Sequence, residues 1–154
     1  MRTLKQGMLS AIIASTIVLF ACNKDDKDNN ILTKNGLPFS GAQEVPARAT
    51  SATGTADVTY NKSTKVLTYT LNWNGLTTIP TISHIHGTAA PGVNAGIKHD
   101  FSSGIPKTVS GTFSNSTTID GVSIKEDSLL SGFYYFNIHT STYPGGEIRA
   151  QITF

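Results

Sequence analysis

The sequence predicts an all-β domain, a Greek-key β-sandwich of about eight strands, and three observations lead to this prediction. The chain has 154 residues, which is enough for one domain with its own core. Only 14% of the residues are charged, while Gly, Ser, Thr and Asn are abundant, and this composition disfavours long helices. Short runs of alternating apolar and polar residues recur between turn residues from about residue 36 onward.

The expected strands follow from this alternation. They are residues 37–45, 53–60, 65–74, 81–86, 97–101, 108–114, 129–140 and 146–154. The clearest is 65–74, in which every second residue is large and apolar. These residues are Leu67, Tyr69, Leu71 and Trp73. Residues 119–128 predict at most one helical turn, and no longer helix is expected. An antiparallel sandwich is therefore the natural arrangement.

Residues 1–21 are interpreted as a lipoprotein signal peptide and not as part of the fold. Arg2 and Lys5 precede an apolar run at 8–21, which is shorter than the roughly 20 residues that a membrane span needs. The run ends in Leu19-Phe20-Ala21-Cys22, which resembles the lipobox of bacterial lipoproteins. That resemblance implies cleavage before Cys22 and lipidation of its thiol. The alternatives for this one cysteine are a buried thiol or a disulfide between two chains.

Residues 22–35 are expected to be the lipidated cysteine and a flexible tether, because 23–30 are polar and charged without an apolar anchor. Lys24-Asp25-Asp26 also resembles a signal that directs some lipoproteins to the cell surface. Removing Arg2 and Lys5 from the twelve basic residues leaves ten, which balance the ten acidic residues. This balance favours no nucleic-acid partner, and the protein would reach a membrane through its lipid.

A candidate metal site begins with His84-Ile85-His86. In a strand, the side chains of His84 and His86 project from one face and that of Ile85 from the other, toward a core. Imidazole is a common protein ligand of copper and zinc near neutral pH. Residues 88–96 are rich in glycine and small residues and predict a loop beside the two histidines. In the alternative interpretation, both histidines hydrogen-bond to this loop and hold it in place.

His139 is the third member of the candidate site. The alternation in residues 133–139 places Ile138 toward the core and His139 on the opposite face. If this strand lies beside residues 81–86, three imidazoles converge, which is enough for a copper or zinc site with one open position. His99 belongs to no motif and is expected to be a solvated loop residue.

Three charged residues have structural interpretations as well as functional ones. Glu147 and Arg149 lie two residues apart in the last expected strand and are predicted to point outward as an exposed ion pair. The functional alternative makes Glu147 the acceptor of an imidazole N–H. Glu44, which shortly precedes Pro46, is expected to make a structural contact at a strand end, and the functional alternative makes it a catalytic base.

Six segments together resemble the CHRD (chordin-type) domain family, and they predict a domain at residues 36–154. They are 39–46 (FSGAQEVP), 51–56 (SATGTA), 67–76 (LTYTLNWNGL), 84–92 (HIHGTAAPG), 136–140 (FNIHT) and 144–149 (PGGEIR). The resemblance implies a β-rich extracellular module, found in animal growth-factor antagonists and in bacterial secreted proteins. The predicted sandwich would be superoxide dismutase-like or immunoglobulin-like.

The candidate site is also similar to that of copper/zinc superoxide dismutases. Those enzymes use a His-x-His strand, a later histidine and an arginine near the C-terminus that guides an anionic substrate, a role that would fall to Arg149. This similarity crosses folds and raises the hypothesis without showing it. The chain has no Asp- and His-rich zinc loop beside the candidate ligands, so only a copper-only enzyme would fit.

Three functions therefore stay open. The first is a lipid-anchored binding module that holds copper or zinc through His84, His86 and His139. The second is a copper-only superoxide dismutase-like enzyme, which is the less favoured of the first two. The third is a metal-free adhesion domain that binds an extracellular protein. In each case the expected location is a bacterial outer membrane or cell surface, with the domain outside the cytoplasm and anchored through Cys22.

Overall fold

The computed structural model describes residues 30–154. The predicted signal peptide, Cys22 and the predicted tether as far as residue 29 lie outside the described residues. The elements are β1 (Ile31–Ser40), the 3-10 helix η1 (Gly41–Gln43), β2 (Thr53–Asn61), β3 (Val66–Asn74), β4 (Pro80–Gly87), β5 (Ile97–Asp100), β6 (Gly111–Thr118), α1 (Glu126–Leu130), β7 (Tyr134–Thr140) and β8 (Ile148–Gln151). Within this part of the chain, no helix is long and apolar enough to span a membrane.

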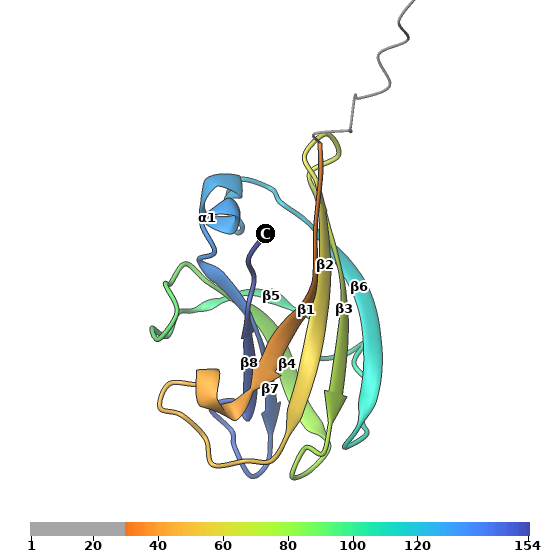
Figure 1. Ribbon diagram of the computed structural model, residues 1–154, viewed down its shortest axis with the longest axis vertical. Helices are drawn as coiled ribbons and strands as arrows, with labels where there is room; N and C mark the ends of the chain where they lie inside the picture. Colours follow the sequence, from red (N-terminus) through yellow and green to blue (C-terminus); the bar gives the residue numbers. More distant parts are fainter. Residues whose placement is uncertain (1–29) are drawn as a thin grey trace, which may run out of the picture.

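The eight strands form one antiparallel sheet in the order β5-β4-β7-β8-β1-β2-β3-β6 (Figure 1). This confirms the predicted all-β fold of about eight strands. The two halves are not separate sheets, because β1 joins β8 through the pair Ser40–Arg149. The sheet curls until its edges approach: Phe101, just after β5, stacks on Phe113 of β6 with 5.6 Å between ring centroids. The result is a nearly closed barrel.

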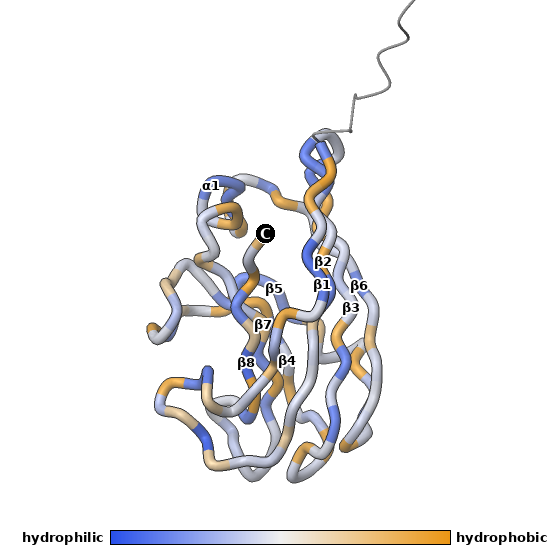
Figure 2. The backbone as a smooth tube through the Cα atoms, viewed as in Figure 1, coloured by the Kyte–Doolittle hydropathy of each residue, from blue (hydrophilic) through white to orange (hydrophobic). Residues whose placement is uncertain are grey.

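The hydrophobic core lies inside the curled sheet. The apolar face predicted for β3 is confirmed, because Leu67, Tyr69, Leu71 and Trp73 are all buried. Hydrophobic and hydrophilic residues alternate along the strands in Figure 2, as a sheet with one apolar face requires. Tyr69 packs on Phe136 of β7 with 4.9 Å between ring centroids. The two halves of the sheet therefore meet across one core.

The first strand begins earlier than the sequence predicts. β1 pairs with β2 from Ile31 onward, so residues 31–35 belong to a strand although the sequence places them in the tether. Asn35 and Gly36 have turn chemistry, but they lie at a register shift in β1 where Gly36 has a φ of 68°. The strand continues past this bulge because β2 supplies hydrogen-bonding partners on both sides of it.

Two later elements also shift from their predicted positions. β6 spans Gly111–Thr118 and not 108–114, because it pairs along nearly the whole of β3. The single helical turn expected within 119–128 is α1, which ends two residues later at Leu130. The long strand predicted at 129–140 therefore begins only at Tyr134.

The β4-β7-β8 half of the sheet is covered on both faces, and this positions the candidate site. All seven residues of β7 are buried. One face of β7 meets the core, and the loops 41–50 and 88–96 cover the other. Asn94 of the second loop donates to the Val45 carbonyl of the first at 2.8 Å, so the two loops are joined above the sheet. Polar residues on this face are thereby removed from solvent.

Candidate metal centre

Strand β4 places two histidines on the face opposite the core. Ile85 is fully buried in the core, as predicted, so His84 and His86 project to the covered face. His84 is 3% exposed and His86 is half-buried. The pairing of β4 with β7 runs without a register shift from Ser83 to Gly87, which places both histidines beside β7.

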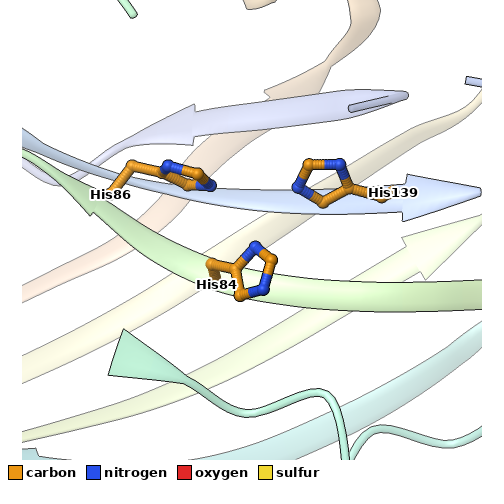
Figure 3. A group of neighbouring side chains, drawn as sticks. All are labelled: His84, His86 and His139. Atoms are coloured by element: carbon orange, nitrogen blue, oxygen red, sulfur yellow. The ribbon is translucent and has the colours of Figure 1, made fainter. Parts of the chain in front are cut away.

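The third histidine comes from β7, the neighbour of β4 in the sheet. The register pairs Ser83 with Ile138 and His84 with Asn137, so His139 lies next to the pair on the same face. The ring centroids are 5.3 Å apart for His84 and His86, 5.1 Å for His84 and His139, and 6.0 Å for His86 and His139. Figure 3 shows the three rings gathered beside β4 and β7. The predicted convergence of the three imidazoles is present.

Two of the rings are oriented by backbone carbonyls. His86 Nδ1 lies 2.9 Å from the Ala95 carbonyl, and His139 Nδ1 lies 2.8 Å from the Pro144 carbonyl. A carbonyl oxygen only accepts hydrogen bonds, so each Nδ1 carries the proton and donates it. Nε2 of each ring then has a free lone pair, and both Nε2 atoms are buried without a hydrogen-bond partner. This is the orientation that metal-binding histidines need.

His84 presents its other ring nitrogen to the cluster. Its Nδ1 is buried without a partner, while its Nε2 lies 3.9 Å from Oδ1 of the exposed Asp100 on β5. Burial, and then the like charges on His139 and His86, lower the pKa of His84 to about 4. Burial also lowers the pKa of His86 and of His139. All three rings are therefore neutral near pH 7, the form that binds a metal.

The donor set fits a copper or zinc ion. One ring nitrogen from each of the three histidines lies within 4.8 Å of the others. Zinc–nitrogen bonds of about 2.0–2.1 Å bring tetrahedral ligands to about 3.4 Å of one another, so the rings would close in slightly on an ion. Three imidazoles leave one position open, and the set does not distinguish copper from zinc.

The prediction that Glu147 and Arg149 form an exposed ion pair is wrong. Glu147 is 0% exposed and Arg149 is 1% exposed, because the two covering loops bury the face that the sequence assigns to solvent. Glu147 accepts hydrogen bonds from Thr50 at 2.8 Å, from Thr77 at 2.8 and 2.9 Å and from Thr140 at 2.7 Å. Its partners are hydroxyls and a backbone N–H, and in the described part of the chain none is an imidazole.

Glu147 is an ionised clamp between three segments of the chain. Burial by itself would raise its pKa, but the hydrogen bonds from Thr140, Thr50 and Thr77 outweigh burial and hold the pKa below its ordinary value. The carboxylate joins the segment before β2, the segment before β4 and the end of β7. Glu147 directly follows the Pro144–Gly146 turn, whose Pro144 carbonyl accepts from His139. The clamp therefore helps to fix the position of that turn.

Arg149 lies beside the cluster and is separated from it by an aromatic ring. Its guanidinium sits over the Tyr135 ring at 3.4 Å from the centroid. His86 also stacks on Tyr135, with 5.0 Å between ring centroids and 6° between planes. β7 lies between β4 and β8, so Tyr135 stands between Arg149 and His86. By strand alternation Tyr135 shares a face with His139, and no sequence motif pointed to its contacts with His86 and Arg149.

Two further charged or titratable residues have structural positions. Glu44 is buried and accepts a hydrogen bond from Asn137 Nδ2 at 2.6 Å, in agreement with the expected structural contact. His99 was expected in a solvated loop, but it lies half-buried on β5 opposite Ile85. Ile85 faces the core, so His99 lies on the core side and away from the cluster. The pairing of β5 with β4 sets His99 opposite Ile85 and Asp100 opposite His84, and the sequence alone does not reveal this pairing.

Comparison with known proteins agrees with the resemblance that the sequence suggested. Residues 37–152 match the CHRD domain family. This stretch contains all three clustered histidines and seven of the eight strands completely, together with part of β1. No curated protein and no solved structure matches the chain.

Proposed function

The chain belongs to the CHRD domain family, and we propose that it is an extracytoplasmic binding module that holds one copper or zinc ion through His84, His86 and His139. The ion would serve storage, delivery or stiffening of the domain. The observation that carries this proposal is the set of three buried, unpartnered ring nitrogens gathered within one ion's reach.

The energetics favour a bound ion. A buried polar atom without a hydrogen bond costs about 1–3 kcal/mol, and three such atoms lie together in this cluster. A metal ion satisfies all three lone pairs at once. The carbonyls of Ala95 and Pro144 already fix two of the rings, so binding would order little that is not ordered.

The binding module is favoured over a superoxide dismutase-like enzyme. Arg149 would have to face the open metal position to guide an anion to it. The Tyr135 ring stands between Arg149 and His86, and the guanidinium packs on the far side of that ring. Asp100 lies 3.9 Å from His84 Nε2, and its carboxylate would repel an anion.

We also propose that Cys22 anchors the domain to a bacterial outer membrane or cell surface. The apolar run that ends in Leu19-Phe20-Ala21-Cys22 supports this location. Growth with labelled palmitate is expected to label the wild-type chain and not a Cys22→Ser variant. Equal labelling of both would contradict the anchor.

The metal proposal is tested by metal content. The full-length chain, purified without a polyhistidine tag, is loaded with zinc or copper and analysed by mass spectrometry of the metals. We expect about one ion per chain in the wild type and its loss in a His84→Ala/His86→Ala variant. His99→Ala is the matched control, because it removes a half-buried histidine outside the cluster and is expected to keep the ion.

Two other results would redirect the proposal. Copper retained together with superoxide dismutation would establish the enzyme in place of the binding module. No metal in any of the three chains after loading would overturn both metal functions. The histidines would then be structural, and the function would be the metal-free, protein-binding alternative.

A further inference from the structure

A second polar site lies on the other side of Tyr135 from the histidine cluster. A cavity of about 250 Å³ opens between the η1 segment and the 88–96 loop, above β8. Ala42, Val45 and Pro91 supply apolar walls, and Glu44 and Arg149 supply the charged groups. The volume corresponds to about eight water molecules, which suits a small organic ligand and not a drug-sized one.

Arg149 brings unused hydrogen-bond donors to this cavity. The side chain is 1% exposed and donates to the Val93 carbonyl at 3.0 Å and to Gln151 Oε1 at 2.9 Å. A guanidinium has five N–H groups, so three have no protein partner among residues 30–154. A guanidinium donates in its own plane, and the Tyr135 ring covers one of its faces. Its free donors therefore lie along its edge, and Arg149 is one of the residues that line the cavity.

The charge balance around the cavity is positive. Arg149 and Arg48 both lie close enough to Glu44 to act on it electrostatically. Burial nevertheless raises the pKa of Glu44 to about 7, so near neutral pH a large fraction of its carboxyl groups is uncharged. Oε1 accepts from Asn137, and Oε2 has no hydrogen-bond partner in the described part of the chain. A protonated Oε2 can donate a hydrogen bond to an anion that Arg149 holds.

We propose that this cavity binds a small monocarboxylate, with its carboxylate on the edge of Arg149 and beside Glu44. Its short aliphatic tail packs against Ala42, Val45 and Pro91. The match is chemical: a planar guanidinium recognises a carboxylate through two parallel hydrogen bonds, and a neutral carboxyl group adds a third. The site shares no residue with the histidine cluster, and Tyr135 packs against both Arg149 and His86.

Butyrate is the probe for this proposal. The full-length chain is titrated with sodium butyrate near pH 6 while the amide signals and the Arg149 Nε–H signal are followed by NMR. We expect saturable shifts at Arg149 and Gly92 with one site per chain. Butyramide has the same shape without the charge and is expected to bind about tenfold more weakly or worse. Arg149→Lys keeps the charge without the planar fork and is also expected to weaken binding about tenfold.

A second variant protects the test against misfolding. Ala42 is exposed at the cavity wall, so Ala42→Leu fills the cavity without touching the core. It is expected to keep the wild-type melting temperature and to lose butyrate binding. The His84→Ala/His86→Ala variant is expected to bind butyrate like the wild type, which separates this proposal from the metal site. Absence of saturable shifts, equal binding of butyramide, or unchanged binding by Ala42→Leu would each overturn the proposal.

Discussion

Tyr135 and His86 lie parallel, with 5.0 Å between ring centroids and 6° between ring planes. The Tyr135 hydroxyl also accepts a hydrogen bond from the Ala95 N–H at 3.1 Å, and the Ala95 carbonyl accepts from His86 Nδ1. One tyrosine therefore positions both the imidazole and the carbonyl that orients it. This arrangement links the histidine cluster to the loop that covers it.

Two substitutions of Tyr135 separate the contribution of its hydroxyl from that of its ring. Tyr135→Phe keeps the stack and leaves the Ala95 N–H without its acceptor, so we expect a loss of about 1 kcal/mol in the free energy of unfolding. Tyr135→Leu removes the stack as well and is expected to lose about 2–4 kcal/mol and to weaken metal binding. Urea unfolding and zinc titration measure the two effects. Equal losses for both variants would contradict a role for the ring.

Zinc is expected to stabilise the folded chain. A ligand that binds only the folded state adds about 2.7 kcal/mol at a concentration 100 times its Kd. The melting temperature of the wild type should therefore rise when zinc is added and return to its starting value when a chelator is added. His139→Ala should lose this response, while His99→Ala should keep it. A zinc response in His139→Ala as large as in the wild type would exclude His139 as a ligand.

Glu147→Gln is expected to destabilise the domain by about 2–4 kcal/mol, because the amide replaces a buried carboxylate that accepts four hydrogen bonds and presents an N–H₂ group to donors. The pKa of Glu147 is held below its ordinary value, so its stabilising effect is present near neutral pH and is lost as the pH falls through that lowered pKa. The control is Glu126→Gln, at a partly exposed ion pair with Lys65, where a much smaller loss is expected. Urea unfolding at pH 7 compares the two.

Glu44→Gln is expected to stabilise the domain at high pH, whereas Glu147→Gln destabilises it. The folded pKa of Glu44 is about 7, above the ordinary 4.5, so wild-type stability falls as the pH rises through this interval and ionises a buried group. Gln cannot ionise and still accepts from Asn137. At pH 8 the variant should therefore be more stable than the wild type by about 1–3 kcal/mol, and at pH 4 the difference should vanish. A difference that does not depend on pH would contradict the raised pKa.

Gly146 is expected to tolerate no side chain. Its φ is +114°, and a Cβ there would collide with Asn137 Nδ2 and lie 2.7 Å from Glu44 Oε1. Gly146→Ala should therefore lose about 1–3 kcal/mol of stability. Gly96→Ala is the control, because a Cβ at Gly96 meets nothing within 4 Å and its φ is not positive. The melting temperatures of the two variants are compared, and an equal change in both would contradict the prediction.

The alternation of apolar and polar residues along each strand was sufficient to assign side chains to the two faces of the sheet. The alternation in β3 predicted its buried apolar stripe, and the alternation around Ile85 and Ile138 predicted that His84, His86 and His139 point away from the core. This succeeds because successive side chains of a strand point to opposite faces, whatever the strand pairs with. The all-β class and the three candidate ligands were thus readable from local pattern alone.

What only the tertiary structure decided is which faces are adjacent and which are covered. The order of strands brings β7 beside β4, and a register across about fifty residues of chain sets His139 next to His84. The loops at 41–50 and 88–96 cover the second face, so Glu147 and Arg149 are buried although their alternation resembles that of a solvated face. Strand periodicity records which side of the sheet a residue takes. It does not record what packs on that side, because that depends on contacts between segments far apart in the chain.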